Sequence, residues 1–424
     1  MSRLAAHPMW LAYAGAWSFV GALSWTTAAV YLIRDVGMSP LQLVLAGTAL
    51  EVAVFLCEIP TGVLADLYSR RLSLVVAALV SGIGMVLVGL ASSPAAVLIA
   101  MALWGFGWTF RSGAEDAWLA DEVGADRLAR AYQHGAQVER LAGLAGIGLA
   151  TGLALVALWL PFVVAGCFTC LLGVVLIVAM PENGFAKPVR EAGTSATVHA
   201  ALQTARAGRR VVWAHPILLL ILAIAFVTGA WSEGWDRLWE AHLLVDVGLP
   251  RLFGLEDVVW FGVLAAGGLA LSFAVAAPLV RRLERLPPVG LPRLLLSLNA
   301  LLILAALGFA LSGRLWLSIA CYWATSVLRS LADAPYRTWL NLSITDSSVR
   351  ATVFSITNLA GSAGEWTGGP ALGWVGTRWS VRTALAVGAL SLSPVLALFY
   401  RAGTHHRRDA PIVGVASSQP STDS

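Results

Sequence analysis

The sequence predicts an all-α integral membrane protein with twelve transmembrane helices in two pseudo-symmetric halves of six. The first observation is composition, because 58% of the 424 residues are hydrophobic and only 12% are charged, with a mean hydropathy of +0.76. Soluble domains carry about 25% charged residues. The second observation is that apolar stretches near the ~20 residues needed to cross a bilayer recur along the chain. We therefore expect lipid to be the solvent of this protein.

An internal repeat is the third observation. When the chain is shifted by 218 residues, Arg111-Ser112 falls on Arg329-Ser330. The same shift places Leu141-Ala142-Gly143 on Leu359-Ala360-Gly361. Repeats of this kind are typical of transporters whose substrate site lies where two homologous halves meet.

The predicted elements follow the apolar stretches in order. We expect residues 1–180 to form the first half and residues 215–400 the second. Residues 181–214 are predicted to be a cytoplasmic linker with an interfacial helix from Thr197 to Trp213, because that segment combines apolar and basic residues. Residues 401–424 are expected to be a disordered cytoplasmic tail. The predicted spans are 10–33, 42–66, 72–92, 95–118, 129–157, 161–180, 216–245, 257–280, 293–312, 315–337, 350–375 and 382–400.

The basic residues predict the orientation of these spans. If the N-terminus is inside, most of the 28 Lys and Arg residues fall on the cytoplasmic side. The positive-inside rule then places both termini in the cytoplasm, and we expect the cytoplasmic (inner) membrane as the location. The same topology explains the net charge of +4 without nucleic-acid binding.

Charged residues also sort the spans. Every third span (72–92, 161–180, 293–312 and 382–400) has no charge in its interior, whereas charges concentrate in six of the others. A charge facing lipid is costly, so charged spans must face protein or a water-filled cavity. We expect the uncharged spans to lie outside and the charged spans to line a central path.

One loop resembles a known family. The sequence Gly62-Val63-Leu64-Ala65-Asp66-Leu67-Tyr68-Ser69-Arg70-Arg71 is similar to the signature loop of the major facilitator superfamily, Gly-x-x-x-Asp-Arg-x-Gly-Arg-Arg. It departs from that pattern at Leu67 and Ser69. The segments 58–62 and 111–121 resemble an efflux-type, drug:proton antiporter-like branch of the same superfamily. This resemblance implies twelve helices that open a central site alternately to either side.

The same loop predicts a cytoplasmic gate. We expect Gly62 to let its span pack closely, and Asp66 to lie against the positive N-terminal end of span 350–375. Arg70 and Arg71 could reach Asp121 or Glu122 at the end of the fourth span. The alternative is a turn whose arginines only set topology.

Two carboxylates are candidates for proton coupling. Glu51 lies about ten residues into its span, or ~15 Å at 1.5 Å per residue, which is near the midplane. Glu365 lies at a similar depth in span 350–375. Either side chain could carry a proton, and the alternative is a carboxyl group that stays permanently paired.

Arg111 resembles the membrane-embedded arginine of the antiporter motif, which makes it a coupling candidate together with Glu115. Glu115 is four residues away and could simply neutralise it. Arg329 is the repeat partner of Arg111, and Asp333 follows it on the same helix face. Both a coupling and a structural role stay open for Arg111.

Span 216–245 supplies further cavity candidates. Glu233 and Arg237 have the spacing of a helical ion pair, and Asp236 adds negative charge. Trp231 and Trp235 form an aromatic stripe beside them. Aromatic and acidic side chains together suit an amphipathic or cationic substrate. The alternative is an interfacial tryptophan belt with a structural ion pair.

No enzyme, cofactor or metal pattern is found. Gly-x-Ser-x-Gly, P-loop and His-Glu-x-x-His patterns are absent, which argues against catalysis and ATP-driven transport. The leading hypothesis is a secondary active transporter that exports amphipathic small molecules or drugs in exchange for protons. The alternatives are a dedicated transporter of one polar metabolite and a membrane sensor without transport.

Overall fold

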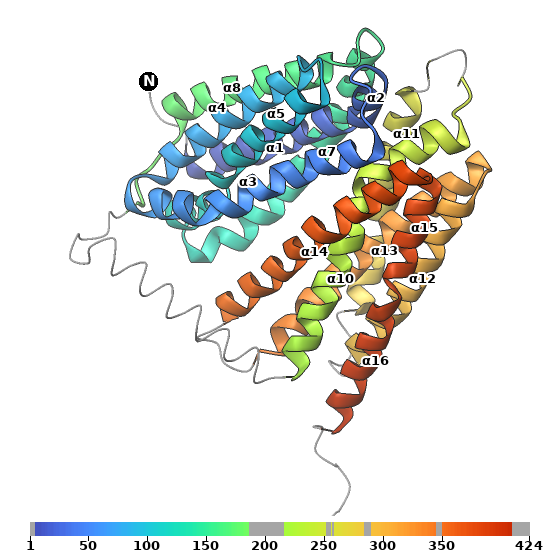
Figure 1. Cartoon of the computed structure of the whole chain (residues 1–424). Helices are drawn as coiled ribbons and strands as arrows, with labels where there is room; N and C mark the ends of the chain where they lie inside the picture. The colour runs from blue at the N-terminus through green and yellow to red at the C-terminus, as the bar shows by residue number, and fades with distance from the viewer. Residues whose placement is uncertain are drawn as a thin grey trace, which may run out of the picture.

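The computed structural model describes residues 5–185, 216–251, 256, 258–283, 290–344 and 350–408. Its helices form twelve membrane-spanning rods, six before the linker and six after it, as predicted (Figure 1). The helix predicted at 197–213 lies outside the described residues. The positions of the rods agree closely with the predicted spans. A long apolar segment in lipid forms a helix, because every backbone N–H and C=O group must be hydrogen-bonded within the protein.

The first rod of the first half is broken into two helices, Ala6–Trp25 and Ala28–Arg34. Ser39, Ser69 and Ser93 cap the helices that follow them, each accepting a hydrogen bond from a backbone N–H in the first turn. The helices are α1 (Ala6–Trp25), α2 (Ala28–Arg34), α3 (Pro40–Leu67), α4 (Arg70–Gly89), α5 (Pro94–Thr109), α6 (Ala114–Val123), α7 (Ala125–Ala154) and α8 (Leu160–Ala179).

The second half repeats this arrangement. Its last helix continues to Arg408, past residue 400 where the predicted disordered tail begins. The helices are α10 (Pro216–His242) with the π-helical turn η1 (Leu243–Val247), α11 (Val258–Leu283), α12 (Leu291–Leu311), α13 (Leu315–Leu342), α14 (Arg350–Arg378), α15 (Val381–Ser391) and α16 (Ser393–Arg408).

The fourth rod is interrupted where the sequence predicts a continuous span. Helix α5 ends at Thr109 and α6 begins at Ala114, so Arg111 lies in the turn between them. Gly113 has a φ of +73°, a left-handed conformation that suits glycine, and it is the N-cap residue at which α6 begins. Arg111 is therefore held on a tight turn rather than within a helix.

Three of the rods carry charged residues and fall short of the hydropathy of a membrane span. Among the described residues, eight helical spans are long and apolar enough to cross a membrane by composition alone. Rods α7, α13 and α14 do not reach that threshold, and they carry Glu139, Arg329 and Glu365 respectively. These rods depend on protein neighbours, because charge facing lipid is costly.

The two halves meet along α3 and α14, which lie side by side in Figure 1. We call the end formed by residues 35–39 the Met38 end, and the end formed by residues 68–69 the Ser69 end. Near the Met38 end, the backbone N–H of Leu41 donates to Thr377 Oγ1 at 2.9 Å. A Cβ added at Gly373 would lie only 3.0 Å from Leu41 Cα. The halves are therefore closed against each other at this end.

Towards the Ser69 end the halves diverge (Figure 1). Phe55 on α3 still contacts Trp366 on α14, with ring centroids 4.5 Å apart. Beyond it, Leu56 and Leu64 are 65% and 45% exposed. Among the described residues, a Cβ added at Gly62 would meet nothing within 4 Å, so the predicted close packing at Gly62 is not found with the part of the chain that the structure describes. The reason is that the opposing half lies too far from α3 at this end.

Candidate functional site

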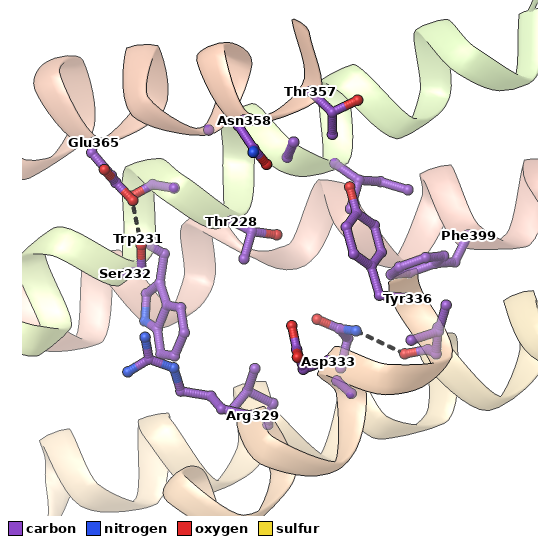
Figure 2. A pocket seen from close by; sticks show the side chains of 18 of the residues that line it. Thr228, Trp231, Ser232, Arg329, Asp333, Tyr336, Thr357, Asn358, Glu365 and Phe399 are labelled. Atoms are coloured by element: carbon purple, nitrogen blue, oxygen red, sulfur yellow. Dashed lines mark hydrogen bonds between the residues drawn. The ribbon is translucent and has the colours of Figure 1, made fainter. Parts of the chain in front are cut away.

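The second half encloses a cavity of about 510 Å³ between α10, α12, α13, α14 and α16. Figure 2 shows side chains from facing helices pointing into one space. We call it the C-half cavity. It is lined by Ile224, Ala225, Thr228, Gly229, Trp231, Ser232, Leu295, Asn299, Leu302, Arg329, Ala332, Asp333, Tyr336, Thr357, Asn358, Gly361, Ser362, Glu365 and Phe399.

Hydrogen-bonding groups are distributed around this cavity. Thr228 and Ser232 come from α10, and Asn358 and Ser362 come from α14, which packs directly against α10. Phe399 contributes an aromatic face at one end of the space (Figure 2). The lining therefore combines apolar walls with hydroxyl and amide groups, which suits a small molecule with several polar substituents.

The positive charges of α13 already have carboxylate partners. Arg329 forms a two-pronged ion pair with Asp236 of α10, with N···O distances of 2.5 and 2.9 Å. Its guanidinium also lies 5.2 Å from the centroid of the Trp231 ring, as Figure 2 shows. Arg337 pairs with Asp333 at 3.1 Å. Glu365 adds a further carboxylate to the lining.

A second ion pair lies at the boundary between the halves. Arg237 Nε donates to Glu233 Oε1 at 3.0 Å, which confirms the predicted helical pair. The guanidinium of Arg237 also lies over Trp25 of α1, 4.9 Å from the ring centroid. Gly47 of α3 packs directly on this pair, because a Cβ there would overlap the Glu233 carboxylate. A charged group of the second half is thus enclosed by two helices of the first.

Glu51 lies on the same face of α3 as these contacts. It is one helical turn after Gly47, which touches the Glu233–Arg237 pair, and one turn before Phe55, which touches Trp366. Residues four apart share a helix face. Glu51 therefore faces the second half, and Glu365 immediately precedes Trp366 on the opposing helix.

The first half has a cavity of its own, of about 400 Å³, which we call the N-half cavity. Arg111 on the α5–α6 turn is enclosed at its edge. Its Nε donates to Glu115 Oε2 at 2.7 Å, and its guanidinium lies 4.7 Å from the Trp17 ring and 4.5 Å from the Trp108 ring. The lining residues are Ala14, Trp17, Ser18, Val20, Gly21, Trp25, Met85, Trp104, Trp108, Arg111 and Glu139.

The contacts predicted for the Gly62–Arg71 loop are present in part, and its role as a gate stays a prediction. Arg70 forms an ion pair with Asp121 and donates to the carbonyl of Ala117. Arg71 does not reach Asp121 or Glu122, since its side chain donates to the carbonyls of Leu176 and Ile177 on α8.

The loop has an acidic partner that the sequence analysis missed. Glu182 accepts hydrogen bonds from Ser69 Oγ at 2.8 Å and from the backbone N–H of Arg71 at 3.0 Å. The side chain of Asp66 and the segment 345–349 lie outside what the structure describes. The predicted contact of Asp66 with α14 stays a prediction.

Four of the predicted cavity residues do not line the C-half cavity. Glu233 and Arg237 form the pair between the halves, and Asp236 lies behind the lining as the partner of Arg329. Trp235 is 3% exposed and packs on Phe309 with ring centroids 5.0 Å apart. Trp231 does line the cavity but is only 1% exposed in total, so these tryptophans do not form an interfacial belt.

Several lining residues were missed by the sequence analysis. Thr228 and Ser232 are four residues apart on α10, as are Asn358 and Ser362 on α14. Polar residues repeated at this spacing within an apolar helix mark one face, and that signal could have found them. Among the residues described, no group of three or more His, Cys, Asp or Glu is placed to hold a metal ion.

Comparison with known proteins decides what this architecture is. A model of the Major Facilitator Superfamily matches residues 9–368. The chain belongs to the major facilitator superfamily. Its multi-pass architecture is therefore that of a secondary transporter working by alternating access, and the resemblance of the Gly62–Arg71 loop is confirmed at the level of the superfamily.

Relatives and solved structures agree with this superfamily assignment. The chain is 22% identical over 356 residues to the uncharacterized MFS-type transporter YxaM of Bacillus subtilis (strain 168), covering 83% of this chain and 85% of that protein. The nucleoside transporter NupG matches with a TM-score of 0.75 and 11% identity, over 94% of this chain and 99% of NupG.

A second solved structure is a bacterial homolog of the human lysosomal transporter Spinster, in an inward-facing and unoccupied conformation. It matches with a TM-score of 0.73 and 16% identity, over 96% of this chain and 99% of that chain. At these identities the solved structures show the shared superfamily fold alone.

Proposed function

We propose that this chain is a proton-coupled antiporter of the inner membrane that exports small amphipathic molecules carrying an amine. The single observation that carries the proposal is the C-half cavity, where Glu365 shares the lining with hydroxyl and amide groups. An ammonium group and a proton are alternative ligands of one carboxylate. Exchange follows from this competition, because the site releases one when it takes the other.

The charge balance of the cavity favours a cationic substrate. Two cations, Arg329 and Arg337, are paired with two carboxylates, Asp236 and Asp333. Glu365 brings the group to one excess negative charge. An unneutralised carboxylate within a membrane is costly, so it gains from binding either a proton or an amine.

The open end indicates the side from which a substrate could enter in this conformation, and the proton gradient would set the direction of transport. The Met38 end is closed by the Leu41–Thr377 contact, while α3 is exposed at Leu56 and Leu64 towards the Ser69 end. The positive-inside rule places the arginines of the Ser69 end, and both termini, in the cytoplasm. The cavity would then load from the cytoplasm, and inward proton flow would drive export.

In the opposite stage of the transport cycle, the Ser69 end would close and the Met38 end would open. Arg70 and Asp121 hold α4 against α6 within the first half. We propose that Gly62 and Asp66 meet the start of α14 when the halves close at the Ser69 end. The Arg70–Asp121 pair, together with Arg71 on α8, would keep the loop in position for that contact.

A second candidate is a transporter dedicated to one polar metabolite. The number of hydroxyl and amide groups in the C-half cavity favours this function. Several hydrogen-bonding groups at fixed positions bind one matching ligand tightly and bind others weakly. Breadth of competition separates the two functions. Inhibition of transport by several unrelated amines supports the exporter, and inhibition by a single compound supports the dedicated transporter.

Reconstituted protein tests the coupling. In proteoliposomes with an imposed pH gradient, we expect uptake of the fluorescent cation ethidium to rise with the gradient and to collapse when a protonophore is added. Glu365→Gln removes the titrating carboxyl but keeps its shape. This variant should lose gradient-driven uptake and retain substrate exchange without a gradient.

Glu256→Gln is the matched control, because Glu256 is an exposed carboxylate outside the helices. It should behave as the wild type. Gradient-driven uptake that persists in Glu365→Gln would remove Glu365 from the coupling step. Absence of any gradient-driven uptake by the wild-type protein, across a panel of amines, would overturn the antiport proposal.

A further inference from the structure

The N-half cavity has no role in the function proposed so far. We infer that it is a second subsite, which binds the flat ring system of an aromatic cation such as ethidium. This inference rests on the proposed function, since it names the class of molecule transported. The two cavities would bind the two ends of one amphipathic substrate.

The internal repeat relates the two cavities. Arg111 and Arg329 are 218 residues apart in the sequence. The same shift places three residues that line the N-half cavity, each on a different segment, on residues that line the C-half cavity. The N-half cavity is therefore the structural counterpart of the proposed substrate cavity rather than an unrelated void. The equivalent pairs are Ala14 and Ser232, Arg111 and Arg329, and Glu139 and Thr357.

The chemistry of the two counterparts differs. Four tryptophans from α1 and α5 line the N-half cavity, whereas hydroxyl and amide groups dominate the polar lining of its counterpart. Trp25 and Trp104 are stacked, with ring centroids 5.1 Å apart and planes at 20°. Aromatic faces attract other flat rings and cations. The four are Trp17, Trp25, Trp104 and Trp108.

The charges of this cavity disfavour an anion. Arg111 is neutralised by Glu115, and its guanidinium faces are covered by Trp17 and Trp108. The positive charge of Arg111 is therefore balanced within the protein. Glu139 contributes a carboxylate to the same lining. A neutral or positively charged aromatic ring fits this balance, and a carboxylate or phosphate does not.

Packing alone does not explain the cluster of tryptophans. Protein interiors are close-packed, with few voids larger than a water molecule. The four rings instead surround about 400 Å³ of space. At Gly21, a Cβ would meet no atom within 4 Å, so this wall of the cavity is open. The rings are thus arranged around a volume that a bound ring could fill.

A contact between the halves connects the two subsites. Trp25 lines the N-half cavity, and its ring lies against Arg237 of the second half. Arg237 pairs with Glu233, which directly follows Ser232 in the lining of the C-half cavity. The Glu233–Arg237 pair therefore links Trp25 in the wall of the N-half cavity to the helix that carries Ser232 in the wall of the C-half cavity. A molecule held at both would contact both halves.

Filling the N-half cavity tests the inference. Binding of ethidium, a planar aromatic cation, and of spermidine, an amine without a ring, is measured on purified full-length protein in lipid nanodiscs. Gly21→Phe occupies the space that a ring would use. We expect it to weaken ethidium binding at least about tenfold and to leave spermidine binding within about threefold. Gly148→Phe is the matched control, because a Cβ there also meets nothing within 4 Å.

A second variant removes an aromatic wall. Trp108 is 39% exposed, so Trp108→Leu leaves the core intact, and we expect about a tenfold loss of ethidium binding from the lost stacking. Trp316→Leu is its control, because Trp316 is 73% exposed on α13. Unchanged ethidium binding in Gly21→Phe and Trp108→Leu, or no saturable ethidium binding by the wild type, would overturn the aromatic subsite.

The failure of this inference is distinguishable from failure of the proposed function. If spermidine is exchanged for protons but the two variants bind ethidium normally, antiport stands and the aromatic subsite falls. If ethidium binding depends on Gly21 and Trp108 while no amine moves with the pH gradient, the subsite stands and antiport falls.

Discussion

The guanidinium of Arg237 lies 4.9 Å from the ring centroid of Trp25, and this contact joins the second half of the molecule to the first. Arg237 is simultaneously the partner of Glu233 at 3.0 Å. A cation over an indole face contributes about 0.5–2 kcal/mol, the larger values applying where water is excluded. Each change of conformation that separates the halves must break or rearrange this contact.

The first prediction concerns that contact. Arg237→Lys keeps the charge but loses the planar guanidinium, and Trp25→Leu removes the ring. Each should slow ethidium transport several-fold, and the double variant should be no worse than the more severe single variant. A double-mutant cycle on initial rates measures this coupling. Strictly additive effects would show that the two residues act separately.

The second prediction concerns the close approach of α3 to α10. A Cβ at Gly47 would overlap the Glu233 carboxylate and lie 2.5 Å from Arg237 Nε. Gly47→Ala should therefore displace the ion pair, with an overpacking cost of about 1–3 kcal/mol. Thermal unfolding in detergent and transport rate should both decrease. Gly148→Ala has room for its methyl group and should change neither.

The third prediction concerns the carboxyl group of Glu51. It faces the second half between the contacts made by Gly47 and Phe55. If Glu51 carries a proton together with Glu365, Glu51→Gln should reduce pH-driven uptake at least tenfold while exchange without a gradient continues.

Glu58 provides the control for this experiment on the same helix. It is exposed and accepts a hydrogen bond from Ser112 at 2.9 Å. Glu58→Gln should keep most of the gradient-driven uptake. Equal loss in both variants would indicate that α3 tolerates no change of charge, and would remove the specific assignment to Glu51.

The sequence predicted local pairs better than contacts between helices. Glu233–Arg237 and Arg111–Glu115 are four residues apart, and helical geometry brings such side chains together whatever the tertiary structure is. The Asp236–Arg329 pair was not predicted. Its partners lie on α10 and α13, and their meeting depends on helix rotation that composition does not specify.

The twelve rods themselves were predictable because lipid requires long apolar helices. The break at Arg111 was not, since the hydropathy of residues 94–123 gives no sign of the turn at 110–113, in which Gly113 adopts a left-handed backbone. The two cavities were also missed. A cavity depends on which side chains stay apart, whereas sequence periodicity reports only which side chains share a face.

The last prediction concerns His242, a fully buried side chain at the start of the π-helical turn. Its Nδ1 lies 2.8 Å from Asp246 Oδ2, and its Nε2 lies 3.1 Å from the carbonyl oxygen of Phe309. The ring thereby ties the end of α10 to α12. His242→Phe fills a similar volume but loses both hydrogen bonds and leaves Asp246 without this partner.

A hydrogen bond contributes about 0.5–1.5 kcal/mol net, so His242→Phe, which loses two, should lower the unfolding temperature in detergent. His134→Phe is the control, because His134 is exposed and contacts His7. Since His242 lies in neither cavity, ethidium binding at low temperature should be unchanged in both variants. Reduced binding with normal thermal stability would instead place His242 in the transport cycle, where the tie between α10 and α12 would have to open and close.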